Sequence, residues 1–225
     1  MIYGVQCMPG SQIAPGGGGE EIFVVDFEND TYSLGGVAKT AADVLDITSY
    51  IGGGKFELLE NDTPPQFIDD YLAALVDLSA GWSIVVDLFF YTGKTPGRDI
   101  IGMVDGDELF DHYVEFKVDV GNLRGEQGDT SDNLFASISA PTNTRARVGM
   151  TLASSEVTVA KQGGSPVTET FATVLPLCAK AWIGTSFTGD TMIADYTPIT
   201  LYSIKLYDRL SPSDLQTAVD TGALP

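Results

Sequence analysis

Acidic side chains are the most abundant groups in this sequence that could do chemistry, with 31 aspartates and glutamates against 12 lysines and arginines. Hydrolysis of a glycosidic bond needs two carboxyl groups at a defined separation across the sugar. Two carboxyl groups on one strand would therefore stand at alternate positions, because alternate residues of a strand share a face. The nearest run, Asp105-Gly106-Asp107-Glu108 with Asp111, lies at a turn and lacks that period. The sequence therefore predicts a protein that is not an enzyme.

The same acids are candidate ligands for calcium, which takes roughly six to eight oxygen ligands, often from loop carboxylates. One cluster comprises Asp105, Asp107, Glu108 and Asp111, and a second comprises Asp129, Asp132 and Asn133. Neither has the spacing of an EF-hand loop, and such clusters arise by chance in so acidic a chain. We expect no cofactor, and calcium at the first cluster is the alternative.

The remaining reactive residues lack the partners that catalysis or metal binding needs. His112 is the only histidine, and no nucleophile elbow accompanies it. Cys7 and Cys178 are too few to ligate a structural zinc ion, and we expect free thiols rather than a disulfide. The glycine run at 16–19 lacks the lysine of a phosphate-binding loop, so no nucleotide site is expected.

Aromatic rings beside polar groups can stack on the faces of sugars. Trp182 and Tyr196 are the candidates for such glycan stacking, and Tyr202 and Tyr207 are also available. Most of these residues fall in strand patterns, so packing in a core or lining a groove is the alternative role. Carbohydrate binding without catalysis is therefore one function that the sequence allows.

The net charge of −19 excludes several classes of partner. Nucleic-acid binding rests on phosphate neutralisation by Lys and Arg, and anionic lipid attracts basic segments, so we expect neither partner here. The first ten residues show neither the basic start nor the apolar core of a signal peptide. The charge favours a basic partner surface or cation binding.

The chain divides into an N-terminal arm and one domain. Residues 1–19 include four consecutive glycines, which are costly to order, and apolar side chains that could contact a partner: Ile2, Tyr3, Val5 and Met8. The arm is therefore either a disordered leader or an extended strap that orders against a partner. Residues 20–225 are predicted as a single β-sandwich domain, with leading hairpins at 20–65 and the main body at 66–225.

Short runs with a period of two predict a β-rich domain. Gly81–Tyr91 is apolar on both faces, which is typical of a central strand. In Tyr113–Val120 apolar residues alternate with polar ones, which predicts one core face and one solvated face that carries Glu115, Lys117 and Asp119. The polar, glycine-rich stretch Gly121–Asn133 predicts a surface loop.

Local signals also predict a hairpin and a helix near the C-terminus. The turn Gln162–Ser165 contains a Gly-Gly pair, which favours a hairpin between its flanking strands. Ser211-Pro212-Ser213-Asp214 has a capping serine and a proline suited to the first helical position, and Gly222 is a natural helix end. Residues 66–80 fit a short helix or the start of a strand, and the pattern does not decide between them.

Two stretches carry a family resemblance. Ala181-Trp182-Ile183-Gly184, followed by a strand Leu201–Arg209 that runs into Leu210-Ser211-Pro212-Ser213-Asp214-Leu215, resembles the laminin-G-like, or concanavalin-A-like, jelly-roll family. This resemblance implies an all-β jelly-roll sandwich with an N-terminal extended arm and a short C-terminal helix. The run Phe27–Gly36, leading to Val44-Leu45, resembles the opening of tailed-phage virion proteins that carry this jelly roll.

The second resemblance implies a structural virion protein of a tailed bacteriophage. The main expectation is a capsid decoration protein on the outer capsid surface, where the arm and the jelly-roll body bind the major capsid protein and neighbouring copies, as a trimer. The alternative is a carbohydrate-binding tail or fibre module that recognises a host surface glycan.

Overall fold

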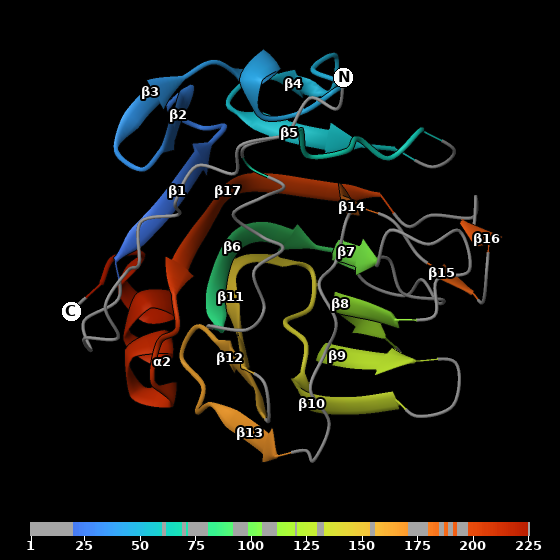
Figure 1. The fold of residues 1–225 in the computed structure, drawn as a ribbon, viewed down its shortest axis with the longest axis vertical. Coiled ribbons are helices and arrows are strands. Elements are labelled where there is room, and N and C mark those ends of the chain that lie inside the picture. Colours follow the sequence, from blue (N-terminus) through green and yellow to red (C-terminus); the bar gives the residue numbers. More distant parts are fainter. Residues whose placement is uncertain are drawn as a thin grey trace, which may run out of the picture.

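The structure of the chain is a computed structural model (Figure 1). It describes residues 20–59, 62–68, 71, 81–91, 99–104, 112–119, 121–129, 133–153, 156–170, 180–184, 187–188, 191–192 and 198–224. Two antiparallel sheets pack face to face across a hydrophobic core, which confirms the predicted all-β jelly-roll sandwich. The predicted arm, residues 1–19, lies outside the described residues.

The larger sheet has ten strands in the order β13-β12-β11-β6-β17-β1-β2-β3, with β5 pairing to β17 and β4 pairing to β5. The strand predicted to be central, β6, lies between β11 and β17, so that prediction is confirmed. The leading residues join the same sheet, because β1 pairs with β17. The bounds are β1 (Glu21–Asp26), β2 (Thr31–Leu34), β3 (Val37–Lys39), β4 (Ile51–Gly52), β5 (Lys55–Leu58), β6 (Trp82–Phe90), β11 (Thr144–Ala153), β12 (Glu156–Lys161), β13 (Val167–Thr170) and β17 (Ile199–Asp208).

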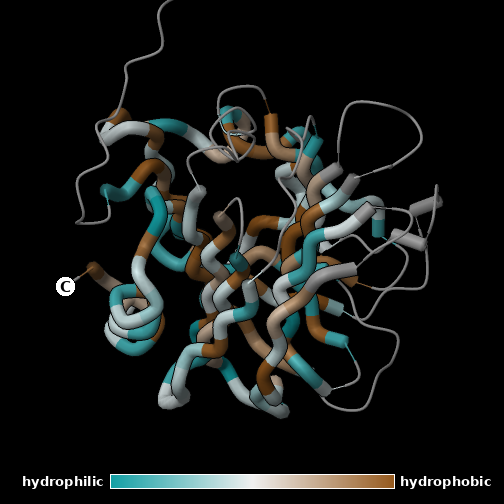
Figure 2. Tube along the Cα trace, turned by 60° about the horizontal axis from the view of Figure 1, so that its bottom comes forward, coloured by the Kyte–Doolittle hydropathy of each residue, from teal (hydrophilic) through white to brown (hydrophobic). Residues whose placement is uncertain are grey.

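The smaller sheet has five strands in the order β10-β9-β8-β7-β14. Apolar residues of alternate positions point from it into the core, and Figure 2 shows hydrophobic and hydrophilic residues alternating along several strands. Its strands are β7 (Asp99–Val104), β8 (His112–Asp119), β9 (Asn122–Asp129), β10 (Asn133–Ser139) and β14 (Lys180–Ile183). A separate two-stranded ladder joins β15 (Phe187–Thr188) to β16 (Thr191–Met192).

The prediction of a surface loop at Gly121–Asn133 is wrong, because most of this stretch is β9, paired with β8 on one side and β10 on the other. Its polar and glycine residues have low strand propensity, but ladders on both edges outweigh that preference. Gly125 lets the two sheets approach closely. A Cβ atom there would lie 2.8 Å from the Met150 sulfur and 2.9 Å from a methyl group of Val157.

The predicted C-terminal helix is confirmed as α2 (Pro212–Thr221). The Ser211 hydroxyl accepts a hydrogen bond from the Asp214 amide, and Gly222 ends the helix at φ 79°. The helix packs through Leu215, Ala218 and Val219 on the face of the larger sheet that points away from the smaller one (Figure 1). Residues on this side of β6, such as Val85, are therefore buried as well.

The helical segments that the structure describes are η1 (Ala41–Asp43) and α2, with a single helical residue at Tyr71. None of them has the length and apolar character that a membrane crossing requires. Most of the ambiguous stretch 66–80 lies outside the described residues. Within it, Gln66 and Phe67 make β-bridges, and the buried Tyr71 ring lies 5.0 Å from that of Phe23.

Candidate functional site

The face of the five-stranded sheet that points away from the core carries polar and aromatic side chains from all five strands. One row of cross-strand neighbours runs across the whole sheet: Trp182, Gly102, Glu115, Glu126 and Phe135. The next row comprises Asp99, Lys117, Arg124 and Ser137. We call this surface the polar face, and with Tyr113 and Asp119 it is the candidate site.

The basic side chains at the centre of the polar face are bound by carboxylates. The Lys117 ammonium group contacts the Glu115 carboxylate and lies 3.1 Å from that of Glu126. The Arg124 guanidinium lies 3.4 Å from the Glu126 carboxylate and 3.1 Å from that of Asp119. Glu126 therefore links both cations, and the five charged groups hold one another in fixed positions.

Two aromatic residues complete this network. The Tyr113 hydroxyl donates a hydrogen bond of 3.0 Å to the Glu126 carboxylate. The Arg124 guanidinium lies over the Phe135 ring, 4.1 Å from its centroid. Phe135 is 41% exposed, so it presents an accessible aromatic surface beside the charged network.

The acidic side chains lie deeper than the basic ones. Asp99, Glu115 and Glu126 are at most 3% exposed, whereas the side chains of Lys117 and Arg124 are 18% and 24% exposed. Glu115 was predicted to lie on a solvated strand face, and this prediction is wrong. The face of β8 that carries Glu115 is polar but buried, because the register brings charged side chains of β9 against it.

Burial also sets the protonation behaviour of the acids. Burial, and then the charge of Glu115, raise the pKa of Asp99 well above its ordinary value. Burial raises the pKa of Glu115 as well, against the lowering effect of Lys117. Burial disfavours the charged form of Lys117, but its neighbours Glu115 and Asp99 outweigh that effect and raise its pKa. Lys117 is therefore held as a cation between acids.

Asp99 differs from the other acids because neither of its carboxyl oxygens has a hydrogen-bond partner among the described residues. It is fully buried and pairs in register with Lys117. Buried polar atoms are usually hydrogen-bonded, and the protonated form that burial favours lets Asp99 occupy this position without a full charge.

The structure describes only some of the residues predicted for a site. Trp182 lies on the polar face in the row of Glu115 and Glu126, but it is 8% exposed, and its stacking role stays a prediction. Tyr196 lies outside the described residues, as do the calcium candidates Asp105, Asp107, Glu108 and Asp111 and the arm residues Ile2, Tyr3, Val5 and Met8. Within the described ranges, no group of three His, Cys, Asp or Glu residues could hold a metal ion.

Sequence reasoning did not select the most characteristic residues of this face. Arg124 and Glu126 lie in the stretch predicted as a loop, and no motif in the sequence marks Phe135. Asp99 carried no signal at all, because an isolated aspartate before an apolar run is common at strand ends. The alternation of Glu115, Lys117 and Asp119 was the one signal that marked this face of the sheet.

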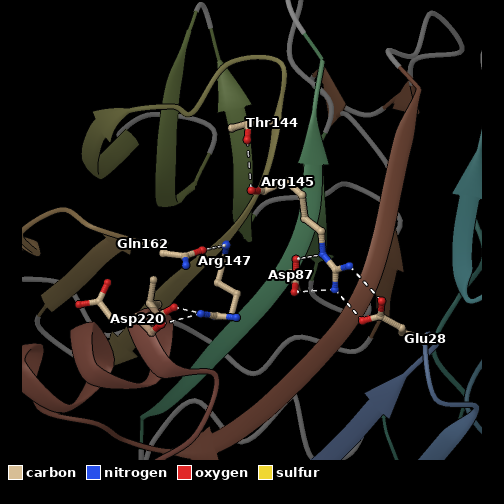
Figure 3. A network of polar contacts seen from close by, with 8 residues as sticks. Glu28, Asp87, Thr144, Arg145, Arg147, Gln162 and Asp220 are labelled. Atoms are coloured by element: carbon tan, nitrogen blue, oxygen red, sulfur yellow. Dashed lines mark hydrogen bonds and ion pairs between the residues drawn. The ribbon is translucent and has the colours of Figure 1, made fainter.

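A second polar network lies on the far face of the larger sheet, beside α2 (Figure 3). The Arg145 guanidinium donates to Asp87 at 2.9 Å and 3.0 Å and to Glu28 at 3.0 Å and 2.7 Å. It also lies 3.7 Å from the centroid of the Tyr202 ring. Arg147 donates to the Val219 and Asp220 carbonyl groups at the end of α2. These contacts fasten the leading hairpin and the helix to the sheet.

The chain was compared with protein families, curated proteins and solved structures, and only the solved structures place its fold among known proteins. No protein-family model and no curated protein matches the chain. Solved structures do match. One is the CBM40 domain of a Ruminococcus gnavus IT-sialidase bound to alpha2,3 sialyllactose, with a TM-score of 0.59 and 14% identity over 74% of this chain and 96% of that one.

Two further neighbours cover more of this chain. Domain 4 of AbnA, a GH43 extracellular arabinanase from Geobacillus stearothermophilus, in complex with arabinotriose, has a TM-score of 0.62 and 14% identity over 90% of this chain and 100% of that one. A botulinum neurotoxin type C structure, from work on its interaction with two ganglioside molecules, has a TM-score of 0.60 and 12% identity over 88% of this chain and half of that one.

None of these three neighbours is a phage or capsid protein. The predicted virion location, capsid decoration role, capsid-protein partner and trimer therefore stay predictions. At such low identities the likeness concerns the fold alone. The chain has the jelly-roll sandwich fold that also forms the carbohydrate-binding domains among these solved structures.

Proposed function

We propose that this protein is a non-catalytic carbohydrate-binding module and that the polar face is its binding surface. The observation that carries the proposal is the fixed network of Lys117, Glu115, Glu126 and Arg124, next to the exposed ring of Phe135. Sugar-binding surfaces combine a few positioned polar groups with an aromatic ring that covers the sugar's apolar face. Jelly-roll neighbours that were solved with bound oligosaccharides support the same proposal.

The geometry of the network explains why a sugar would be held firmly. Each charged side chain has a partner that fixes its rotamer, so little side-chain entropy remains to be lost on binding. Sugar hydroxyl groups both donate and accept hydrogen bonds, and the network offers carboxylate acceptors and ammonium and guanidinium donors. Phe135 lies at the accessible side of the network, where a sugar ring could stack against it.

The same geometry favours binding over hydrolysis. Glycoside hydrolysis requires a carboxylic acid that touches the leaving-group oxygen and a second carboxylate on the sugar. Asp99 has the most strongly raised pKa of the acids on this face, but it is fully buried and cannot reach such an oxygen. Glu115 and Glu126 are at most 3% exposed and both bind Lys117, so neither is placed as the second carboxylate of a hydrolase.

A glycan array probed with the whole chain tests this function. We expect saturable binding to at least one class of printed glycan. Phe135→Ala should reduce that binding about tenfold or more, because it removes the exposed ring. Tyr91→Ala is the matched control, since Tyr91 is 43% exposed but directly follows β6 of the larger sheet. Equal losses in the two variants, or no binding by the parent chain, would contradict the proposal.

The biological setting of the module is also part of this proposal. A tail or fibre module of a bacteriophage that recognises a host surface glycan, which is the alternative expectation from the sequence, agrees with carbohydrate binding. Quantitative mass spectrometry of purified particles would separate that setting from a capsid decoration role, because decoration proteins occur in far more copies than tail proteins.

A further inference from the structure

We propose that the polar face binds an uncharged sugar and discriminates against acidic sugars such as sialic or uronic acids. This inference rests on the proposed carbohydrate-binding function and names its ligand class. It is carried by how the charged groups of the face are paired and by the charge of the whole chain.

The two central cations of the polar face, Lys117 and Arg124, are already bound by carboxylates of the protein. An acidic sugar is usually recognised by a guanidinium or ammonium group that is free to bind its carboxylate. Lys117 is bound by Glu115 and Glu126, and Arg124 is bound by Glu126 and Asp119. A sugar carboxylate would therefore have to displace a carboxylate of the protein and leave it buried without its partner.

Lys180 is the exception among the described cations on this face, because the structure gives it no carboxylate partner. It lies at the start of β14 and is exposed, on the same side of the strand as Trp182. An ion pair between Lys180 and a sugar carboxylate would be exposed at the sheet edge, where solvent screens it, so it would contribute little to binding. Lys180 therefore does not offset the acids at the centre of the face.

The face instead has an excess of hydrogen-bond acceptors. Three acids, Glu115, Glu126 and Asp119, surround its two central cations, Lys117 and Arg124. Sugar hydroxyl groups can donate hydrogen bonds to such acceptors, directly or through a water molecule, whereas a sugar carboxylate brings only further acceptors. The acids that surround Lys117 and Arg124 therefore match a ligand rich in hydroxyl groups and free of negative charge.

The whole chain adds to this selectivity, because its net charge of −19 repels an anionic ligand during approach. An array of matched glycan pairs, each printed with and without a terminal sialic or uronic acid, tests the inference with the whole chain. We expect each bound neutral glycan to bind at least about tenfold more tightly than its acidic partner. Raising the salt concentration should reduce the difference in affinity between the neutral and the acidic glycans, because salt screens the charge repulsion.

Three outcomes are distinguishable. A preference for neutral members supports the inference. Equal or tighter binding of acidic members overturns the inference and leaves the proposed function in place. Binding to no glycan overturns both.

A charge variant adds a test of the cause. Glu126→Gln removes the carboxylate that Lys117 and Arg124 share, so both cations could bind a sugar carboxylate more readily. The ratio of the affinity for neutral glycans to that for acidic glycans should therefore fall at least about threefold. Glu169→Gln, on the exposed edge strand β13, removes the same charge elsewhere and should leave the ratio unchanged. An equal change in both variants would assign the selectivity to net charge and contradict the role of the network. If Glu126→Gln fails to fold, the comparison of matched glycans still decides the inference.

Discussion

At the scale of single residues, Lys117 is the centre of the candidate site. Its ammonium group lies between Glu115 and Glu126, and Asp99 pairs with it in register. A buried acid is tolerated when a cation accompanies it, and removal of that cation leaves an uncompensated charge. Lys117 therefore stabilises the fold as well as the shape of the polar face.

Lys117→Met should lower the free energy of unfolding by about 3 kcal/mol, because Glu115 and Glu126 lose their shared partner. Urea denaturation at neutral pH measures the change. Lys55→Met is the control, since Lys55 pairs with Glu57 at 3.1 Å and both side chains are more than a third exposed, at 37% and 38%. Such exposed pairs contribute little, and an equal loss in both variants would argue against a special role for Lys117.

The raised pKa of Asp99 gives a second residue-scale prediction, with a defined sign. A carboxyl group whose pKa is higher in the folded than in the unfolded state binds its proton more tightly when folded, so stability falls as the pH rises above about 3.9. Asp99→Asn removes this titration. The variant should gain stability over the parent chain as the pH is raised towards neutrality, and the two should be most similar in acid.

Urea denaturation across that pH range measures the difference between the two proteins. Asp119→Asn is a suitable comparison, because Asp119 belongs to the same face but its side chain is 28% exposed. A stability difference for Asp99→Asn that does not change with pH would mean that Asp99 is not perturbed in the folded chain.

At the scale of elements, β9 shows how pairing overrides local preference. Its sequence reads as a loop, yet it lies between β8 and β10 and supplies Arg124 and Glu126 to the polar face. Gly125, on the opposite face of the strand, lets β9 approach β11 and β12. One strand therefore both closes the core and carries the site.

Gly125→Ala should destabilise the chain by about 1–3 kcal/mol, because its Cβ atom would overlap Met150 and Val157 in a packed core. Thermal or urea unfolding measures this loss. Gly52→Ala is the matched control, since a Cβ atom there meets nothing within 4 Å. A Gly125→Ala variant as stable as the control would show that the sheets have room to separate at this point.

At the scale of the whole molecule, the two sheets have different surroundings. The larger sheet carries α2 and the Arg145 network on its far face, and these contacts tie the leading hairpin and the C-terminus to the sandwich. The polar face of the smaller sheet lies on the opposite side of the molecule. The scaffold and the candidate site are therefore separate surfaces of one fold, and changes near Arg145 should leave ligand selectivity unaltered.

The sequence by itself determined those features that depend on neighbours along the chain. Strand alternation predicted a β-rich domain, the two apolar faces of Gly81–Tyr91 predicted a central strand, and the Ser211-Pro212 signal predicted α2. These predictions succeeded because side-chain period and helix capping are local properties. The same local reasoning failed for β9, whose stability comes from ladders on both of its edges.

Only the tertiary structure decided which charged residues meet. Asp99, Glu115 and Glu126 belong to three different strands, and the register between those strands, with a shift next to Asp99, brings them around Lys117. Cross-strand register depends on how whole sheets pack, and no single segment encodes it. The individual acids and Trp182 could therefore be identified in the sequence. Their pairing, their burial and the lack of hydrogen-bond partners at the Asp99 carboxyl oxygens are properties of the folded chain.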